Sequence, residues 1–104
     1  MVEQGAGPFG VVDPRLTIYA LANGMDLVKD EGTRRLEWYR DGRERGILVE
    51  ATDGGTLRVT AQAWSREDAS SMAALPQGPP HAPEALAKNI AAILEQALEA
   101  ANGL

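Results

Sequence analysis

The stretch ILVEATDGGTLRVTAQAW, residues 47–64, decides the fold because its two halves mirror each other in character. Folding it at its glycine-containing centre, residues 53–55, places Val49 opposite Val59 and leaves the charged side chains on the other face. A slip of one residue would turn every apolar side chain of one strand toward solvent, so this register is strongly favoured. The stretch therefore predicts a β-hairpin with one core face and one solvated face.

A further strand is predicted before this hairpin. Residues 33–40, TRRLEWYR, alternate between apolar and charged side chains, as a half-buried strand does. Charge favours a register that sets Arg35 opposite Glu50, because the alternative that sets Glu37 opposite Glu50 costs a few tenths to about 1 kcal/mol. The prediction is a charge ladder of Arg35, Glu50 and Arg58 across three strands.

The segment before these strands allows two interpretations. Residues 16–22 followed by Asn23-Gly24 have the signature of a β-hairpin with a two-residue turn, and the succession Thr-Ile-Tyr favours a strand. However, Asp13-Pro14 is a good helix start and Asn23-Gly24 is a good helix stop. We favour a hairpin over residues 16–28 and keep a helix as the alternative.

Residues 1–13 contain three glycines and one proline and are predicted to form a flexible leader that Phe9 anchors. Residues 14–104 are then a single domain. No apolar run approaches the roughly 20 residues needed to span a membrane. Because the chain has no cysteine, we expect a reducing, cytoplasmic location.

The C-terminal part predicts two helices. Ser65 as a cap, acidic residues after it and Pro76 as a stop indicate a short helix near residues 66–74. After a proline-rich linker, residues 83–101 form a helix of about 28 Å, long enough to cross four or five strands. One side of this helix is apolar. Its residues are Leu86, Ile90, Ile93, Leu94, Ala97, Leu98 and Ala101. The fold class is α+β, an antiparallel meander of four to five strands with one face covered by the long C-terminal helix.

Residue types that support catalysis are scarce. The chain has no cysteine and one histidine, His81, which lies among prolines, so the usual nitrogen and sulfur ligands of zinc are lacking. No serine stands in a glycine-flanked nucleophile turn, and no phosphate-binding glycine motif is present. We therefore expect no enzymatic activity, no catalytic residue, no cofactor and no metal site.

The net charge of −5 argues against binding to nucleic acids or anionic membranes, because phosphate contacts depend on excess lysine and arginine. Residues 29–66 nevertheless hold eight of the ten basic side chains. On the open side of the sheet they predict an interaction face that combines arginines and aromatics. Its residues are Tyr39, Leu48, Trp64, Arg35 and Arg58, with Arg43 and Arg45 at its edge.

These features predict a small non-catalytic protein-interaction domain, an adaptor or chaperone-like module. Its partner is another protein or a second copy of itself, and a homodimer is expected because open sheet edges and outer apolar residues invite pairing. One alternative is a single-stranded nucleic-acid-binding domain that uses the same face. Another is a small-molecule pocket between sheet and helix, lined by Trp38, Met25 and Met72.

Overall fold

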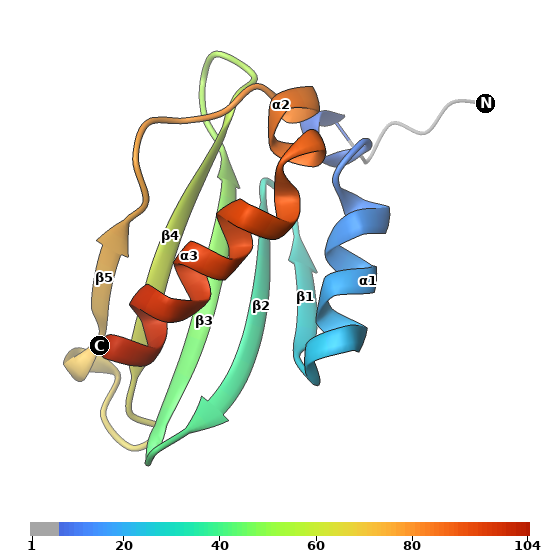
Figure 1. Cartoon of the computed structure of the whole chain (residues 1–104). Coiled ribbons are helices and arrows are strands. Elements are labelled where there is room, and N and C mark those ends of the chain that lie inside the picture. The colour runs from blue at the N-terminus through green and yellow to red at the C-terminus, as the bar shows by residue number, and fades with distance from the viewer. Residues whose placement is uncertain (1–6) are drawn as a thin grey trace.

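The computed structural model describes residues 7–104, apart from the side chain of Ala69. It confirms the α+β fold: five antiparallel strands in the order β1-β2-β3-β4-β5 with helices on one face (Figure 1). The strands are β1 (Asp26–Asp30), β2 (Thr33–Arg40), β3 (Arg43–Ala51), β4 (Leu57–Trp64) and β5 (Ala73–Pro76). The helices are α1 (Asp13–Asn23), α2 (Pro83–Lys88) and α3 (Ile90–Gly103). Helix α3 lies diagonally across the sheet and contacts β3 and β4, while α1 covers β1 beside it.

The β3–β4 hairpin has the predicted register. Val49 pairs with Val59 and Glu50 pairs with Arg58. Both valines are fully buried, and Leu94 of α3 is fully buried with them in the same core. The apolar face of this hairpin is therefore closed by the C-terminal helix, as the sequence predicted.

The predicted register between β2 and β3 is wrong by two residues. Arg35 lies opposite Leu48, and Thr33 takes the place opposite Glu50, so the ladder does not extend from Glu50 to Arg35. The cause is the two-residue turn Asp41-Gly42, whose φ angles of 51° and 81° are those of a tight hairpin turn. This turn fixes the pairing of the residues that flank it, and its geometry outweighs one cross-strand charge pair.

Residues 13–23 form the helix α1, so the favoured hairpin over residues 16–28 is wrong. Pro14 stands in the first turn, where a missing N–H costs nothing. Gly24 ends the helix with a left-handed φ of 67°, and its N–H binds the carbonyl of Ala20. Leu16 and Ala20 then point into the core, which a helix at this position can fill.

Two other segments differ from the expectation in detail. The short helix expected near residues 66–74 is a single 3-10 turn, Ala69–Ser71, and β5 follows it. The long helix expected over residues 83–101 is interrupted at Asn89, which has φ −113° and ψ 25°. The apolar stripe continues across this break, because Leu86 and Ile90 are both buried.

Part of the segment before α1 packs into the core. Phe9 is 2% exposed and Val12 is fully buried, so Phe9 anchors its segment as expected. The rest of the expected leader, residues 1–6, lies outside the described residues, and the boundary at residue 14 stays a prediction.

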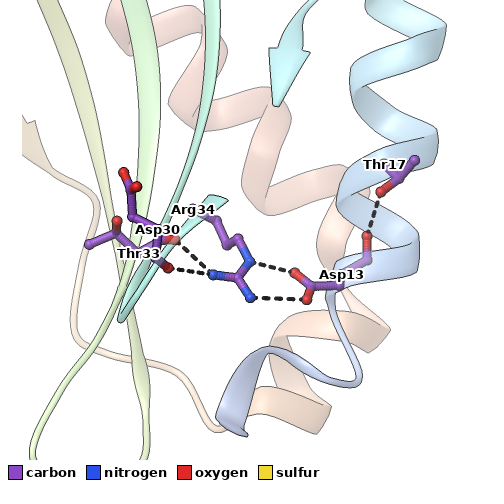
Figure 2. Close-up of polar contacts among 5 residues, drawn as sticks. All are labelled: Asp13, Thr17, Asp30, Thr33 and Arg34. Atoms are coloured by element: carbon purple, nitrogen blue, oxygen red, sulfur yellow. Dashed lines mark hydrogen bonds and ion pairs between the residues drawn. The ribbon is translucent and has the colours of Figure 1, made fainter. Parts of the chain in front are cut away.

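A buried arginine joins α1 to the sheet (Figure 2). Arg34 of β2 faces the helices, and its guanidinium donates to both carboxylate oxygens of Asp13, at 2.8 and 3.2 Å. It also donates to the carbonyls of Asp30 and Thr33, each at 2.8 Å, and lies 4.1 Å from the ring centre of Phe9. Two hydrogen bonds from one guanidinium to one carboxylate fix the relative orientation of the two groups and also stabilise their contact. Arg34 therefore sets where α1 begins relative to the β1–β2 turn.

Candidate interaction surfaces

Five of the seven predicted interaction residues lie on the sheet face opposite the helices: Tyr39, Leu48, Trp64, Arg35 and Arg58. This follows from the pairings, because side chains alternate between the two faces along each strand. Tyr39 and Arg58 are exposed, and the other three are half-buried. The structure therefore brings these five side chains to one surface, which we call the open face.

The other two predicted residues, Arg43 and Arg45, point to the helix side. Arg45 is 4% exposed and donates to the carbonyl of Ala101 at 2.5 Å. Arg43 donates to the carbonyls of Leu104 at 3.1 Å and Ser71 at 3.0 Å. The last carbonyls of a helix lack internal partners and attract positive charge. Both arginines therefore stabilise the end of α3 and are not part of the open face.

The indole of Trp64 packs against the backbone of β3 on the open face. It lies against Gly46, where an added Cβ would come within 3.3 Å of the Trp64 ring and of Arg35 Cδ. The Arg35 guanidinium lies 5.5 Å from the ring centre of Trp64, and its Nε lies 3.0 Å from Glu37. A side chain at position 46 would push the Trp64 ring and Arg35 by a few tenths of an ångström, so the glycine allows this close packing.

A second arginine–aromatic stack lies at the edge of the open face. Arg66 lies over the ring of Tyr39, 4.8 Å from its centre, and forms an ion pair with Glu44. The groove between the two stacks has a volume of about 550 Å³. Its walls carry two arginines and two glutamates, namely Arg35, Arg66, Glu37 and Glu44. Positive charge on this face is thus largely matched by carboxylates of the same chain.

The outer face of α1 carries exposed aliphatic side chains that the sequence interpretation did not identify. Leu21 is 78% exposed, Ile18 is 66% exposed and Val11, just before the helix, is 42% exposed. We call these three residues the α1 patch. The α1 patch could have been identified if residues 13–23 had been predicted to be a helix. Successive helical residues turn by about 100°, so Ile18 points roughly 200° away from buried Leu16.

Beside the α1 patch, a groove of about 240 Å³ runs between α1 and α3. Its lining is almost entirely apolar and includes Ile18 itself. The lining residues are Arg15, Ile18, Tyr19, Ala22, Ile90 and Ala91. A protruding aliphatic ridge and an apolar groove therefore share one surface.

Tyr19 joins the two helices in this region. Its hydroxyl donates to a carboxylate oxygen of Glu95 at 3.0 Å. Burial of the ring, followed by the hydrogen bond and the charge of Glu95, raises the pKa of Tyr19 to about 12. Within the described part of the chain, neither Arg15 nor Glu95 forms an ion pair.

The residues proposed for a small-molecule pocket are not brought together. Met25 and Trp38 line a groove of about 470 Å³ near the end of α3, where Trp38 Nε1 donates to Asn102 at 3.0 Å. Met72 lines the groove of the open face instead. The predicted combination of Trp38, Met25 and Met72 is therefore wrong as a single pocket.

The single histidine of the chain is joined to the start of β4 through its backbone. The backbone of His81 pairs with that of Leu57, with both hydrogen bonds at 2.8 Å. Over residues 7–104, no group of three or more histidine, cysteine, aspartate or glutamate residues is placed to hold a metal ion. In the same residues, no helix combines the length and apolarity that crossing a bilayer demands.

Comparisons with known protein families, with curated proteins and with solved structures found no match.

Proposed function

We propose that the chain is a non-catalytic protein-interaction domain, an adaptor or chaperone-like module, and that it binds its partner through the α1 patch. The observation that carries this proposal is the exposure of Ile18 and Leu21, at 66% and 78%. Burying one such side chain in an interface is worth about 1.5–3 kcal/mol. Contiguous exposed apolar residues mark interaction sites more often than scattered ones do.

The edges of the sheet are less suited to binding a partner strand. Gln77 donates its N–H to the carbonyl of Val59 at 2.8 Å, and the alternation of an antiparallel pair then directs the backbone of Ala74 and Pro76 outward. Proline has no N–H to offer. At the opposite edge, β1 carries the charged and exposed residues Asp26, Lys29 and Asp30, which discourage pairing.

The open face also supports the proposal less well than α1 does. Its arginines Arg35 and Arg66 already stack on aromatic rings and pair with glutamates of the same chain. A partner would have to displace these contacts. Arg35 and Arg66 are paired with glutamates, and Arg43 and Arg45 point toward the helices. Little unpaired positive charge is therefore left on the open face to bind the phosphates of a nucleic acid.

Photo-crosslinking tests the proposal. A benzophenone amino acid placed at Leu21 should give discrete protein adducts in cells that naturally produce the protein. The same amino acid at exposed Arg58, on the open face, is the matched control and should give none. Adducts from position 58 with none from position 21 would overturn the proposal.

A further inference from the structure

We propose that the occupant of the α1 patch is a second copy of this chain, with the two α1 helices packed antiparallel about a two-fold axis near Ile18. This inference rests on the proposed function and names its partner. It differs from the dimer expected from the sequence, which used the sheet edges and the open face.

The shape of this surface suits self-association. A two-fold interface uses the same patch on both copies, so that patch must be complementary to itself. Here a ridge formed by Ile18 and Leu21 stands directly beside the apolar groove, and Ile18 belongs to both. Two copies that meet at Ile18 can each cover the ridge and groove of the other.

The charges select the antiparallel arrangement. Arg15 lines the groove at the end nearer the start of α1. One turn further along α1, about 6 Å away, Tyr19 binds the carboxylate of Glu95. Arg15 thus supplies a positive charge at one end of this apolar groove, and Glu95, which binds the lining residue Tyr19, supplies a negative charge about one turn further along. Neither charge has an ion-pair partner among residues 7–104.

A two-fold axis that reverses the helix direction brings Arg15 of one copy over Glu95 of the second copy, twice in each dimer. A parallel arrangement would instead bring Arg15 near Arg15 and Glu95 near Glu95, which repel. Because each chain carries a net charge of −5, two copies repel at most surfaces. The balanced charge of this groove makes it a favourable place for them to meet.

Sedimentation velocity of the purified chain, at micromolar to submillimolar concentration, tests this dimer. The wild type should populate a dimer, and Leu21→Asp should raise its dissociation constant by at least about tenfold, since burying one leucine is worth that much or more. Leu75→Asp is the matched control on β5, where the leucine is 47% exposed, and should leave the constant unchanged. A wild type that stays monomeric throughout would overturn the proposal.

A charge-reversal cycle tests the geometry. Arg15→Glu and Glu95→Arg should each weaken the dimer by roughly five- to tenfold, because each change affects two symmetry-related contacts. The double variant should recover to within about twofold of the wild type. Asp53→Arg, at the exposed tip of the β3–β4 hairpin, controls for net charge and should not weaken it. A double variant no tighter than the weaker single variant would contradict the antiparallel pairing.

The two proposals can fail separately. A monomeric wild type whose position 21 still crosslinks to a different protein would overturn the dimer and leave the proposed function standing. A monomeric wild type with no adduct at position 21 would overturn both. Thermal unfolding of each variant excludes misfolding as the cause of lost association, and Leu21 is exposed enough for its replacement to leave the fold intact.

Discussion

The hydroxyl of Tyr19 donates to a carboxylate oxygen of Glu95 across the space between α1 and α3, at 3.0 Å. This contact joins the two helices that form the layer above the sheet (Figure 1). Tyr19 also lines the groove proposed as the dimer interface. The contact therefore affects both the pKa of Tyr19 and the surface proposed for dimerisation.

The first prediction concerns the titration of Tyr19. In a Tyr39→Phe variant, where Tyr19 is the only tyrosine, absorbance at about 295 nm should report a pKa of about 12. Glu95→Gln should lower this pKa, but it should stay above 10.0 because burial is the largest cause of the shift. A midpoint at the ordinary value in the Tyr39→Phe variant would show that α1 and α3 do not meet at this contact.

The same shift predicts how stability depends on pH. The folded-state pKa lies above the ordinary value of 10.0, so the unfolded chain releases the tyrosine proton first. The stabilising contribution is therefore complete below pH 10.0 and is lost as the pH rises toward 12. Urea unfolding across this range should show a steeper loss of stability in the wild type than in Tyr19→Phe.

The second prediction concerns Arg34. Arg34→Ala removes the guanidinium donor of the Asp13 carboxylate and of two carbonyls, and we expect it to lower the free energy of unfolding by about 2–4 kcal/mol. Arg34→Lys should recover only part of this loss, because an ammonium cannot reproduce the paired hydrogen bonds of the guanidinium. Urea unfolding measures both. Lys29→Ala, at an exposed position, serves as the control and should change stability by less than about 0.5 kcal/mol.

The third prediction concerns the cap on α3. Arg45→Met removes the buried guanidinium donor of the Ala101 carbonyl, which keeps the backbone N–H of Leu104, and we expect the free energy of unfolding to fall by about 1–3 kcal/mol. Hydrogen exchange should show faster exchange in the last turn of α3 and unchanged exchange in α1. Arg58→Met, on the open face, should change neither. An Arg45 variant as stable as the wild type would place Arg45 outside the core.

The fourth prediction concerns the turn that sets the β2–β3 register. Gly42→Val forces a β-branched residue into a φ of 81° and should cost about 1–2 kcal/mol. Asp41→Gly relieves the φ of 51° at its own position and should be neutral or slightly stabilising. The midpoint of thermal unfolding checks both changes. Equal tolerance of valine and glycine in this turn would mean that the turn does not fix the register.

The elements that could be predicted from sequence are those whose apolar side chains can be buried in only one arrangement. The β3–β4 hairpin buries Val49 and Val59 in only one register, and the apolar stripe of residues 83–101 has only one side to bury. The β2–β3 register could not be derived from a charge pair, because such a pair contributes less than the φ requirements of Asp41-Gly42. At Asn23-Gly24 the same two residues suit a hairpin turn and a helix stop, so local chemistry left both open.

The candidate interaction surfaces could likewise be predicted only in part from the sequence. Alternation from buried Val49 already places Arg45 and Arg43 on the core face, so the sequence carried the signal that removes them from the open face. The α1 patch could be found only by treating residues 13–23 as a helix. Its groove also needs Ile90 and Ala91 from α3, and no local pattern brings these two helices together.

The most direct test of the account is the chemical accessibility of the α1 patch in cells that naturally produce the protein. The chain has no cysteine, so Leu21→Cys and Asp53→Cys each introduce one reactive thiol at an exposed position. We predict that maleimide labels position 21 several-fold more slowly in cells than in dilute purified protein, while position 53 reacts equally fast in both. Equal labelling of position 21 in both settings would mean that nothing covers α1, and would contradict the proposed function.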